Sequence, residues 1–348
     1  MDPNSGKKNM FNKLSKQQCI ENLQNEKFSR MTLSFYRYVI LENVDLLRDI
    51  LYKQWSELGV LGRIYIAKEG INAQLSVPSK DFEKFISKLN SHKNFINMPI
   101  KIAVEDNGKS FFKLKIKVRK QIVADGLSIE DYDVTNVGKH LTAYEWNQSI
   151  NKGAIVVDMR NHYESEIGRF KNAICPDVET FREELPIVKD LLNGKEDEEI
   201  LLYCTGGIRC EKTSAYLKHH GFNNVNQLHG GIIDYVRQVN NDITLENKFE
   251  GKNFVFDERR SEKISENIIS NCHQCGEKCD IHVNCINENC NLLFIQCNKC
   301  QKKYKKCCSN TCMSIFNLSP QERKKLRKGV ENKKKYYSHK RVNLNLNN

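Results

Sequence analysis

Residues 199–217 (EILLYCTGGIRCEKTSAYL) constrain the fold of this chain more than any other segment. The short, almost continuous apolar run at 199–203 is typical of a strand buried in a parallel sheet. A cysteine and two glycines follow the run, and a helical stretch comes next. A strand that passes through a tight glycine loop into a helix predicts an open α/β domain. The other expected elements of this unit are a second apolar strand at 154–158 and helical stretches near 141–150, 179–193 and 211–220.

Cys204, the first residue of the loop, is the strongest candidate for a chemical role. Backbone N–H groups of a tight loop and a helix N-terminus favour an anion, so a thiolate placed there has a lowered pKa. Gly206 and Gly207 allow the backbone to close around the sulfur. Arg209 adds a fixed positive charge that could hold an anionic group on the sulfur. Cys210, in the first helical turn, either packs or acts as a resolving thiol, and the alternative for Cys204 is a buried core thiol.

Residues 34–118 show a different pattern, in which strand-like apolar segments alternate with segments whose apolar residues have helical spacing. The order of these elements, β-α-β-β-α-β, predicts a split βαβ, ferredoxin-like domain, and one more strand follows it. The expected strands are 34–41, 60–67, 71–77, 99–104 and 110–118, and the expected helices are 44–58 and 79–90.

The last of these strands carries positive charge along one face. Apolar residues alternate there with Lys113, Lys115, Lys117 and Arg119, and alternate residues of a strand point to opposite faces. The cationic face is either an ordinary solvated sheet face or a strip that binds phosphates, since like charges side by side repel unless an anion meets them.

Cysteines are concentrated near the C-terminus, where ten of the fourteen lie between Cys272 and Cys312. In a chain that starts without an apolar signal region, such a cluster indicates metal before disulfides. Two Cys-x-x-Cys pairs, at 272–275 and 297–300, fit a zinc-ribbon-like spacing, and zinc favours four tetrahedral thiolates. Ten cysteines could hold two ions with two cysteines left over, while disulfides and free thiols are the alternatives. The candidate ligands are Cys272, Cys275, Cys279, Cys297, Cys300, Cys307, Cys308 and Cys312.

The net charge of +12 is also confined to the end of the chain. Residues 297–348 hold fifteen basic and two acidic side chains, so the preceding residues are close to neutral. Basic residues interleaved with tyrosines suit RNA, because lysines meet phosphates and bases stack on aromatic rings. A disordered solubilising tail is the alternative. The candidate RNA-binding residues of this part are Lys302, Lys303, Lys305 and Lys306.

Several classes of protein are excluded at this point. No uncharged apolar run approaches the roughly 18–20 residues that span a bilayer, and no flavin, haem or nicotinamide motif is present, so we expect a cytoplasmic protein without a membrane partner. The expected organisation is a polar lead-in at 1–31, a ferredoxin-like domain at 32–120, a linker at 121–140, an α/β domain at 141–245, a cysteine-rich region at 246–316 and a basic tail at 317–348.

The loop CTGGIRC at 204–210 resembles the active-site loop of a rhodanese domain. The segments VDMR at 157–160 and LHGG at 228–231 are similar to the early and late rhodanese motifs, and they occur in the right order. The whole arrangement resembles the bacterial rhodanese-domain tRNA uridine hydroxylase family over roughly residues 32–316. Beyond the rhodanese motifs, this resemblance rests on AKEGIN at 67–72, KVRKQIV at 117–123, CHQCG at 272–276 and NLLFIQC at 291–297.

The resemblance implies a ferredoxin-like (acylphosphatase-like) N-terminal domain, a rhodanese-like α/β domain and a small cysteine-rich C-terminal region. It also implies an oxygen-dependent enzyme that converts the wobble uridine of tRNA to 5-hydroxyuridine, with molecular oxygen as co-substrate, tRNA as partner and Cys204 as the active-site cysteine and persulfide carrier. The loop alone supports a second hypothesis equally well, a sulfurtransferase that moves sulfane sulfur through a Cys204 persulfide. A third hypothesis is an RNA-binding adaptor, which the intact loop argues against.

Overall fold

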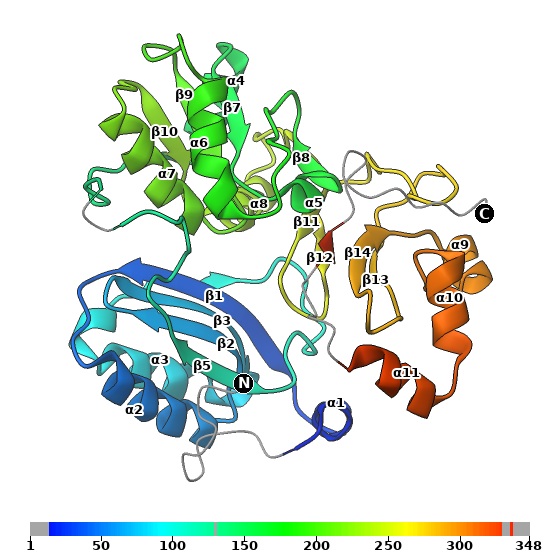
Figure 1. Ribbon diagram of the computed structural model, residues 1–348. Helices are drawn as coiled ribbons and strands as arrows, with labels where there is room; N and C mark the ends of the chain where they lie inside the picture. The colour runs from blue at the N-terminus through cyan, green and yellow to red at the C-terminus, as the bar shows by residue number, and fades with distance from the viewer. Residues whose placement is uncertain (1–13, 129–130, 329–334, 337–348) are drawn as a thin grey trace.

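The computed structural model describes residues 14–128, 131–328 and 335–336. Three parts follow one another along the chain (Figure 1): an N-terminal domain at lower left, a central domain above it, and a C-terminal region at right that contacts both. Most of the expected basic tail at 317–348 lies outside the described residues. Within the described part of the chain, no helix has the length and apolar character needed to cross a bilayer.

The N-terminal domain is a five-stranded sheet with two helices on one face. Because strand residues alternate between faces, Leu33 and Phe35 enter the core under the helices, whereas Tyr36 and Tyr38 point toward the central domain. The strand order is β4-β1-β3-β2-β5, with β5 parallel to β2. The elements are β1 (Arg30–Tyr38), α2 (Val44–Glu57), β2 (Leu61–Ala67), β3 (Gly70–Pro78), α3 (Phe82–Asn90), β4 (Lys101–Ile102) and β5 (Leu114–Val118), preceded by α1 (Lys16–Gln24).

This arrangement confirms the expected ferredoxin-like domain, although several strand ends differ: β1 ends at Tyr38 rather than at residue 41, and β4 covers only Lys101–Ile102 of the expected 99–104. β1 begins at Arg30 rather than at residue 34, because the Arg30 side chain is buried and binds Glu26 and the carbonyl of Gly59. β5 begins at Leu114 rather than at residue 110. The chain at Ser110 instead accepts a hydrogen bond from the backbone N–H of Glu258 in the C-terminal region.

The central domain is a parallel sheet in the order β6-β10-β9-β7, with helices on both faces. The apolar strands fill two cores, one on each side of the sheet, as expected of an open α/β domain. The strands are β6 (Lys139–Leu141), β7 (Ile155–Asp158), β9 (Ile200–Tyr203) and β10 (Val225–Leu228), and the helices are α4 (Ala143–Asn151), α5 (His162–Ser165), α6 (Phe181–Leu191), α7 (Ile208–His219) and α8 (Gly231–Asn241).

The segment at 121–140, expected as a linker, is packed against both domains over its described residues. Ile122, Asp125 and Tyr132 are buried. Lys212 of α7 binds Asp125 at 2.9 Å and Glu69 of the N-terminal domain at 3.1 Å. Since the lysine and Asp125 are almost fully buried, these contacts fix the N-terminal sheet against the central domain.

The C-terminal region continues the central domain before it becomes rich in cysteine. β11 (Phe249–Phe254) pairs with β8 (Gly168–Phe170) of the central domain and with β12 (Ser261–Lys263). Carboxylates of this region reach the N-terminal domain as well, since Glu262 accepts a hydrogen bond from the backbone N–H of Val104. The remaining elements are β13 (His282–Asn284), β14 (Leu292–Ile295), α9 (Asn298–Lys303), α10 (Asn310–Asn317), α11 (Pro320–Arg327) and β15 (Lys335–Tyr336).

Candidate active site at Cys204

Cys204 directly follows β9, and α7 begins four residues later. Its Sγ atom is fully buried and accepts a hydrogen bond of 3.1 Å from the backbone N–H of Gly207. The N-terminus of α8 holds the loop from the other side, because the backbone N–H of Ile232 donates to the carbonyl oxygen of Cys204 at 3.0 Å. The loop is therefore fixed by two helix N-termini, a setting that favours an anion.

The surroundings of Cys204 stabilise a thiolate. Burial by itself raises the pKa of this thiol, but a hydrogen bond from the Cys210 thiol, the charge of Arg209 and hydrogen bonds from two backbone N–H groups of α7 lower it to about 5. Burial, and then the same hydrogen bond, raise the pKa of Cys210 well above its ordinary value. Cys204 is thus ionised at neutral pH, with Cys210 as a neutral donor beside it.

Arg209 is held by a carboxylate rather than being directed at the sulfur alone. Its two terminal nitrogens donate to the two carboxylate oxygens of Glu164, at 2.7 and 3.0 Å. Glu164 is fully buried and Arg209 is 8% exposed. The guanidinium charge still lowers the pKa of Cys204, so it acts on the thiolate from a fixed position.

The two loop glycines have different structural requirements. Gly207 has φ +96°, and a Cβ atom there would lie 2.8 Å from the hydroxyl oxygen of Tyr36, across the domain boundary. A Cβ at Gly206 would meet no atom within 4 Å. The need for glycine is therefore specific to Gly207, where the N-terminal domain approaches the loop. Tyr36 is fixed there by donating a hydrogen bond of 3.0 Å to Glu211 of α7.

A cavity of about 330 Å³ opens beside Cys204, with walls from all three parts of the chain. The loop forms one wall, and Val255, Phe256 and Glu262 of the C-terminal region form another. The N-terminal sheet closes the rest with residues from β1, β2, β3 and β4, among them Tyr36, Arg63, Tyr65, Asn72, Gln74 and Lys101.

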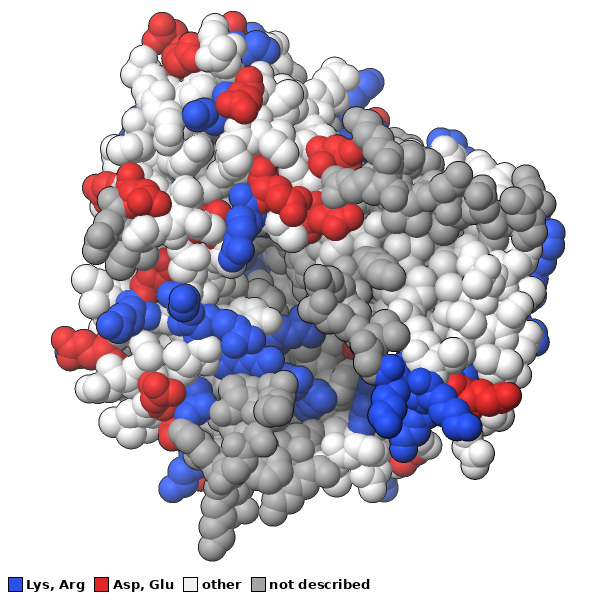
Figure 2. All heavy atoms as spheres, viewed as in Figure 1, with Lys and Arg blue, Asp and Glu red and all other residues white. Residues whose placement is uncertain are grey.

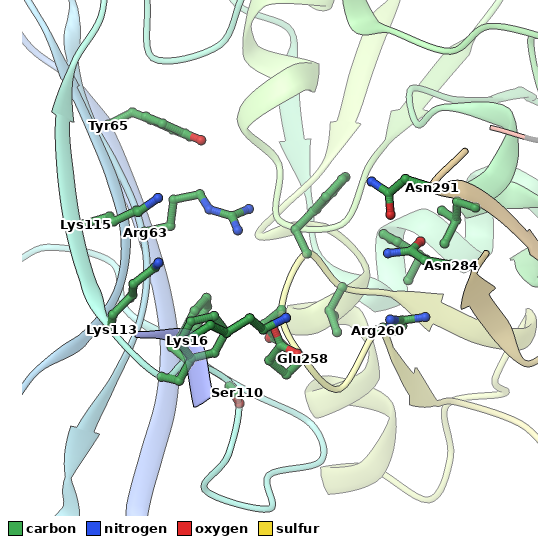
Figure 3. Close-up of a pocket in the computed structure, with 18 of the residues that line it drawn as sticks. Lys16, Arg63, Tyr65, Ser110, Lys113, Lys115, Glu258, Arg260, Asn284 and Asn291 are labelled. Atoms are coloured by element: carbon green, nitrogen blue, oxygen red, sulfur yellow. The ribbon is translucent and has the colours of Figure 1, made fainter. Parts of the chain in front are cut away.

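A larger groove of about 630 Å³ adjoins this cavity and shares Arg63, Tyr65 and Phe256 with it. Figure 2 shows basic side chains gathered along a hollow on the N-terminal domain, facing the C-terminal region. In Figure 3, Arg63 and two lysines of the predicted strip point from the strands into this space, with Asn284 and Asn291 on the opposite wall. The basic residues that line the groove are Lys16, Arg63, Lys113, Lys115, Lys117 and Arg260.

The candidate RNA-binding residues thus fall into two places. Lys113, Lys115 and Lys117 line the groove, whereas Arg119 is exposed just after β5 and lines neither cavity. The basic residues near α9 are exposed and also line neither cavity, and they are Lys302, Lys303, Lys305 and Lys306.

Comparisons with known proteins agree with this architecture. Residues 30–122 match the UPF0176 acylphosphatase like domain, residues 142–238 the rhodanese-like domain, and residues 250–313 the family described as rhodanase C-terminal. A tRNA uridine(34) hydroxylase of Leptospira interrogans is 57% identical over 97% of this chain and 92% of its own. Proteins of the same name from Hamiltonella defensa and Yersinia pestis are 49% and 47% identical, over 94% and 93% of this chain and 93% and 91% of their own.

The chain belongs to the tRNA uridine(34) hydroxylase family. The match extends over the N-terminal domain, the Cys204 loop and the cysteine-rich region alike, so the predicted family and domain types are confirmed. The Cys204 cavity and the groove lie where the three parts of the chain meet.

The cysteine-rich region of this family member contains two groups of four cysteines whose Sγ atoms lie within 4.8 Å of one another. The Sγ–Sγ distances of 3.6 Å for Cys275–Cys297 and for Cys290–Cys308 are close to the roughly 3.8 Å expected around a tetrahedral zinc with Zn–S of about 2.3 Å. None of the fourteen cysteines forms a disulfide. The first group is Cys272, Cys275, Cys297 and Cys300, and the second is Cys285, Cys290, Cys308 and Cys312.

The two groups differ from the candidate ligands in four positions. Cys279 and Cys307 lie outside both groups, and Cys285 and Cys290 take their places. Sequence spacing did not identify this set, because β13 and β14 bring cysteines together across the hairpin. Glu164, Tyr36 and Lys101 were not among the candidate site residues either, since each comes to the site from a distant part of the chain.

Proposed function

We propose that this chain hydroxylates the uridine at position 34 of tRNA to 5-hydroxyuridine, with molecular oxygen as co-substrate. The observation that carries the proposal is the opening of the Cys204 cavity into a basic groove, in a chain that matches tRNA uridine(34) hydroxylases over nearly its whole length. A substrate of this kind places the reaction in the cytoplasm. One atom of the oxygen molecule enters the uracil ring, and the other leaves as water with two electrons and two protons from a reductant.

Cys204 supplies the nucleophile of the proposed reaction. A thiolate with a pKa of about 5 is ionised at neutral pH, and its addition to C6 of uracil makes the neighbouring C5 electron-rich and therefore open to oxidation. Once C5 carries the new oxygen, loss of the C5 proton breaks the C6–S bond, which restores the ring double bond and releases the thiolate. Cys210, Arg209 and the backbone N–H of Gly207 hold the negative charge before the attack. A Cys204 that carries an extra sulfur as a persulfide is the second form of this proposal, because the same groups stabilise an anionic terminal sulfur.

The groove supplies the binding site for the tRNA backbone. Six basic residues line it against Asp257 and Glu258, and the carboxylate of Asp257 is paired with Arg259. Lysines and arginines that meet phosphates provide most of the affinity of proteins for nucleic acids. Tyr65 and Phe112 lie among these residues, where unpaired bases can stack on them.

The cysteine groups are proposed to hold two zinc ions with a structural role. Four thiolates around each ion leave no open position for a substrate, as in other structural zinc sites. The region has little other core, since its two small apolar clusters include the cysteines themselves. The fold around the groove would then depend on the metal.

Nucleoside mass spectrometry of tRNA from cells that lack this gene tests the proposed function. We expect 5-hydroxyuridine to disappear, to return with the natural chain, and to stay absent with Cys204→Ser. Cys175→Ser is the matched control, because burial raises the pKa of this thiol of the same domain to about 12 and leaves it unreactive. An unchanged 5-hydroxyuridine pool, or thiosulfate-to-cyanide sulfur transfer as the dominant activity of the purified protein, would favour the sulfurtransferase hypothesis instead.

A further inference from the structure

Lys101 is a buried cation on the wall of the Cys204 cavity. It lies on the edge strand β4, opposite Ser34 of β1, and is 8% exposed. Its ammonium group sits over the ring of Tyr36, 4.5 Å from the centroid. Within the described residues, this ammonium group forms no ion pair with a carboxylate and makes no hydrogen bond.

A lysine buried in this way lowers the stability of the fold, so its presence needs a reason other than stability. Burial of an ammonium group without an ion pair or a hydrogen bond is unfavourable. Burial lowers the pKa of Lys101, while attraction by Cys204, Asp234 and Glu211 offsets part of this effect. Charged groups that are kept in a cavity at such a cost are typical of binding and catalytic sites. The packing of the N-terminal domain does not require the charge, since the core of that domain lies on the other face of the sheet.

The rest of the cavity is shaped for a flat, partly polar molecule. Aromatic and apolar walls come from Phe111, Phe256 and Ile233, and amide groups come from Asn72 and Gln74. A volume of about 330 Å³ is at the lower end of the range for small-molecule sites. Apolar walls with a few polar groups bind a heterocycle better than they bind a bare anion.

The cavity is also continuous with the groove. Arg63 and Tyr65 of β2 line both spaces, and β5 with its lysines lies beside β2 in the sheet. A nucleic acid whose phosphates follow the groove therefore passes the mouth of the cavity. A single base turned away from its strand can enter there, as bases do in enzymes that modify them.

We propose that this cavity binds the target uracil in a turned-out conformation and that the ammonium group of Lys101 donates a hydrogen bond to a carbonyl oxygen of the base. The inference rests on the proposed function for the identity of the base. Lys101 is then a substrate-binding residue that the N-terminal domain contributes to an active site whose cysteine belongs to the central domain. Base binding and backbone binding should therefore be separable, because Lys101 binds the base and the groove lysines bind the phosphates.

Binding of two RNA stem-loops to the full-length protein tests this inference. One is an anticodon stem-loop with uridine at position 34, and the other is the same molecule with an abasic site there. We expect the natural protein to bind the uridine loop with about tenfold higher affinity than the abasic loop, which is within the range for stacking of one base on aromatic side chains. Lys101→Met should bind the abasic loop as the natural protein does and should prefer the uridine loop less, because the hydrogen bond is lost while the aromatic walls remain.

Lys115→Met is the matched control. Lys115 lines the groove but not the cavity, so its loss should weaken binding of both loops by a similar factor and keep the preference for uridine. Lys101→Leu is the second variant in case Lys101→Met does not fold, as judged by thermal unfolding, and the same loss of preference is expected because leucine has no donor either.

Two outcomes would overturn the inference: a natural protein that binds the two loops equally, and folded Lys101 variants that keep the full preference or lose affinity for both loops equally. Because binding is measured without turnover, the result is independent of hydroxylation. A protein that prefers the uridine loop but forms no 5-hydroxyuridine refutes the proposed function and leaves the base site standing.

Discussion

Glu164 binds both terminal nitrogens of Arg209 in a buried, bidentate ion pair next to the Cys204 loop. Both residues belong to the central domain, but 45 positions separate them in the chain. The pair fixes the guanidinium group, and this group in turn lowers the pKa of Cys204. A contact that looks structural thereby controls how reactive the thiol is.

Arg209→Met should destabilise the protein by about 3–5 kcal/mol, because it leaves the Glu164 carboxylate buried without its ion-pair partner. The double variant Arg209→Met/Glu164→Gln should recover part of this loss, since no unpaired charge is left in the core. Urea unfolding followed by tryptophan fluorescence measures both. Lys263→Met is the control, because the exposed pair with Glu266 is worth less than about 1 kcal/mol. Equal losses in the single and double variants would contradict the pairing.

Cys210→Ala should raise the pKa of Cys204 above its value of about 5. The Cys210 thiol donates a hydrogen bond that favours the ionised sulfur, so its loss favours the protonated form. Alkylation of Cys204 by iodoacetamide, followed by mass spectrometry across pH, measures the midpoint, since only the thiolate reacts. The midpoint should move to higher pH in Cys210→Ala and less far in Cys210→Ser, which retains a donor. An unmoved midpoint in Cys210→Ala would show that the hydrogen bond does not control the thiol.

The local parts of the fold and site were predictable from the sequence. Periodicity gave the ferredoxin-like order of elements, and the Cys204 loop was visible because a strand, two glycines and a helix start are adjacent in the chain. Partners brought by tertiary contacts were not predictable. Tyr36 meets Glu211 across 175 positions, and Lys101 reaches the cavity from an edge strand of two residues. Neither has a sequence pattern that distinguishes it from an ordinary strand residue.

The candidate ligands differ from the two cysteine groups for a related physical reason. Spacing identified the pairs 272–275 and 297–300, which form one group, because Cys-x-x-Cys is the spacing of a single metal-binding turn. Cys285 and Cys290 lie between these pairs in the chain but belong to the other group. The ligand sets therefore interleave, and only the pairing of β13 with β14 sorts them.

The purified protein should contain about two zinc ions, one for each tetrathiolate group. Cys300→Ser and Cys308→Ser should each lower the content to about one ion per chain, because each removes a ligand from a different group. Cys279→Ser is the matched control, since this buried cysteine of the same region lies outside both groups, and it should keep both ions. Elemental analysis by mass spectrometry measures the content. Loss of metal in Cys279→Ser, or none in Cys300→Ser, would refute the assignment.

The groove and the basic residues near α9 can be separated by the salt dependence of tRNA binding. Each phosphate contact with a single strand contributes about −0.7 to the slope of log K against log salt. A triple variant, Lys113→Met/Lys115→Met/Lys117→Met, should therefore reduce the slope by about 2 and weaken binding most at low salt. A second variant serves as the comparison protein. It carries methionine at the four exposed positions near α9, which are Lys302, Lys303, Lys305 and Lys306.

The comparison protein should keep most of the slope, although it loses one charge more than the triple variant. Its four lysines are exposed and line neither cavity, so they contribute only through the general positive field, which salt screens over about 10 Å. Filter binding or fluorescence anisotropy at salt concentrations from roughly 50 to 300 mM measures both slopes. A larger decrease of the slope in the comparison protein than in the triple variant would show that tRNA binds to the C-terminal region. The groove beside Cys204 would then bind some other ligand.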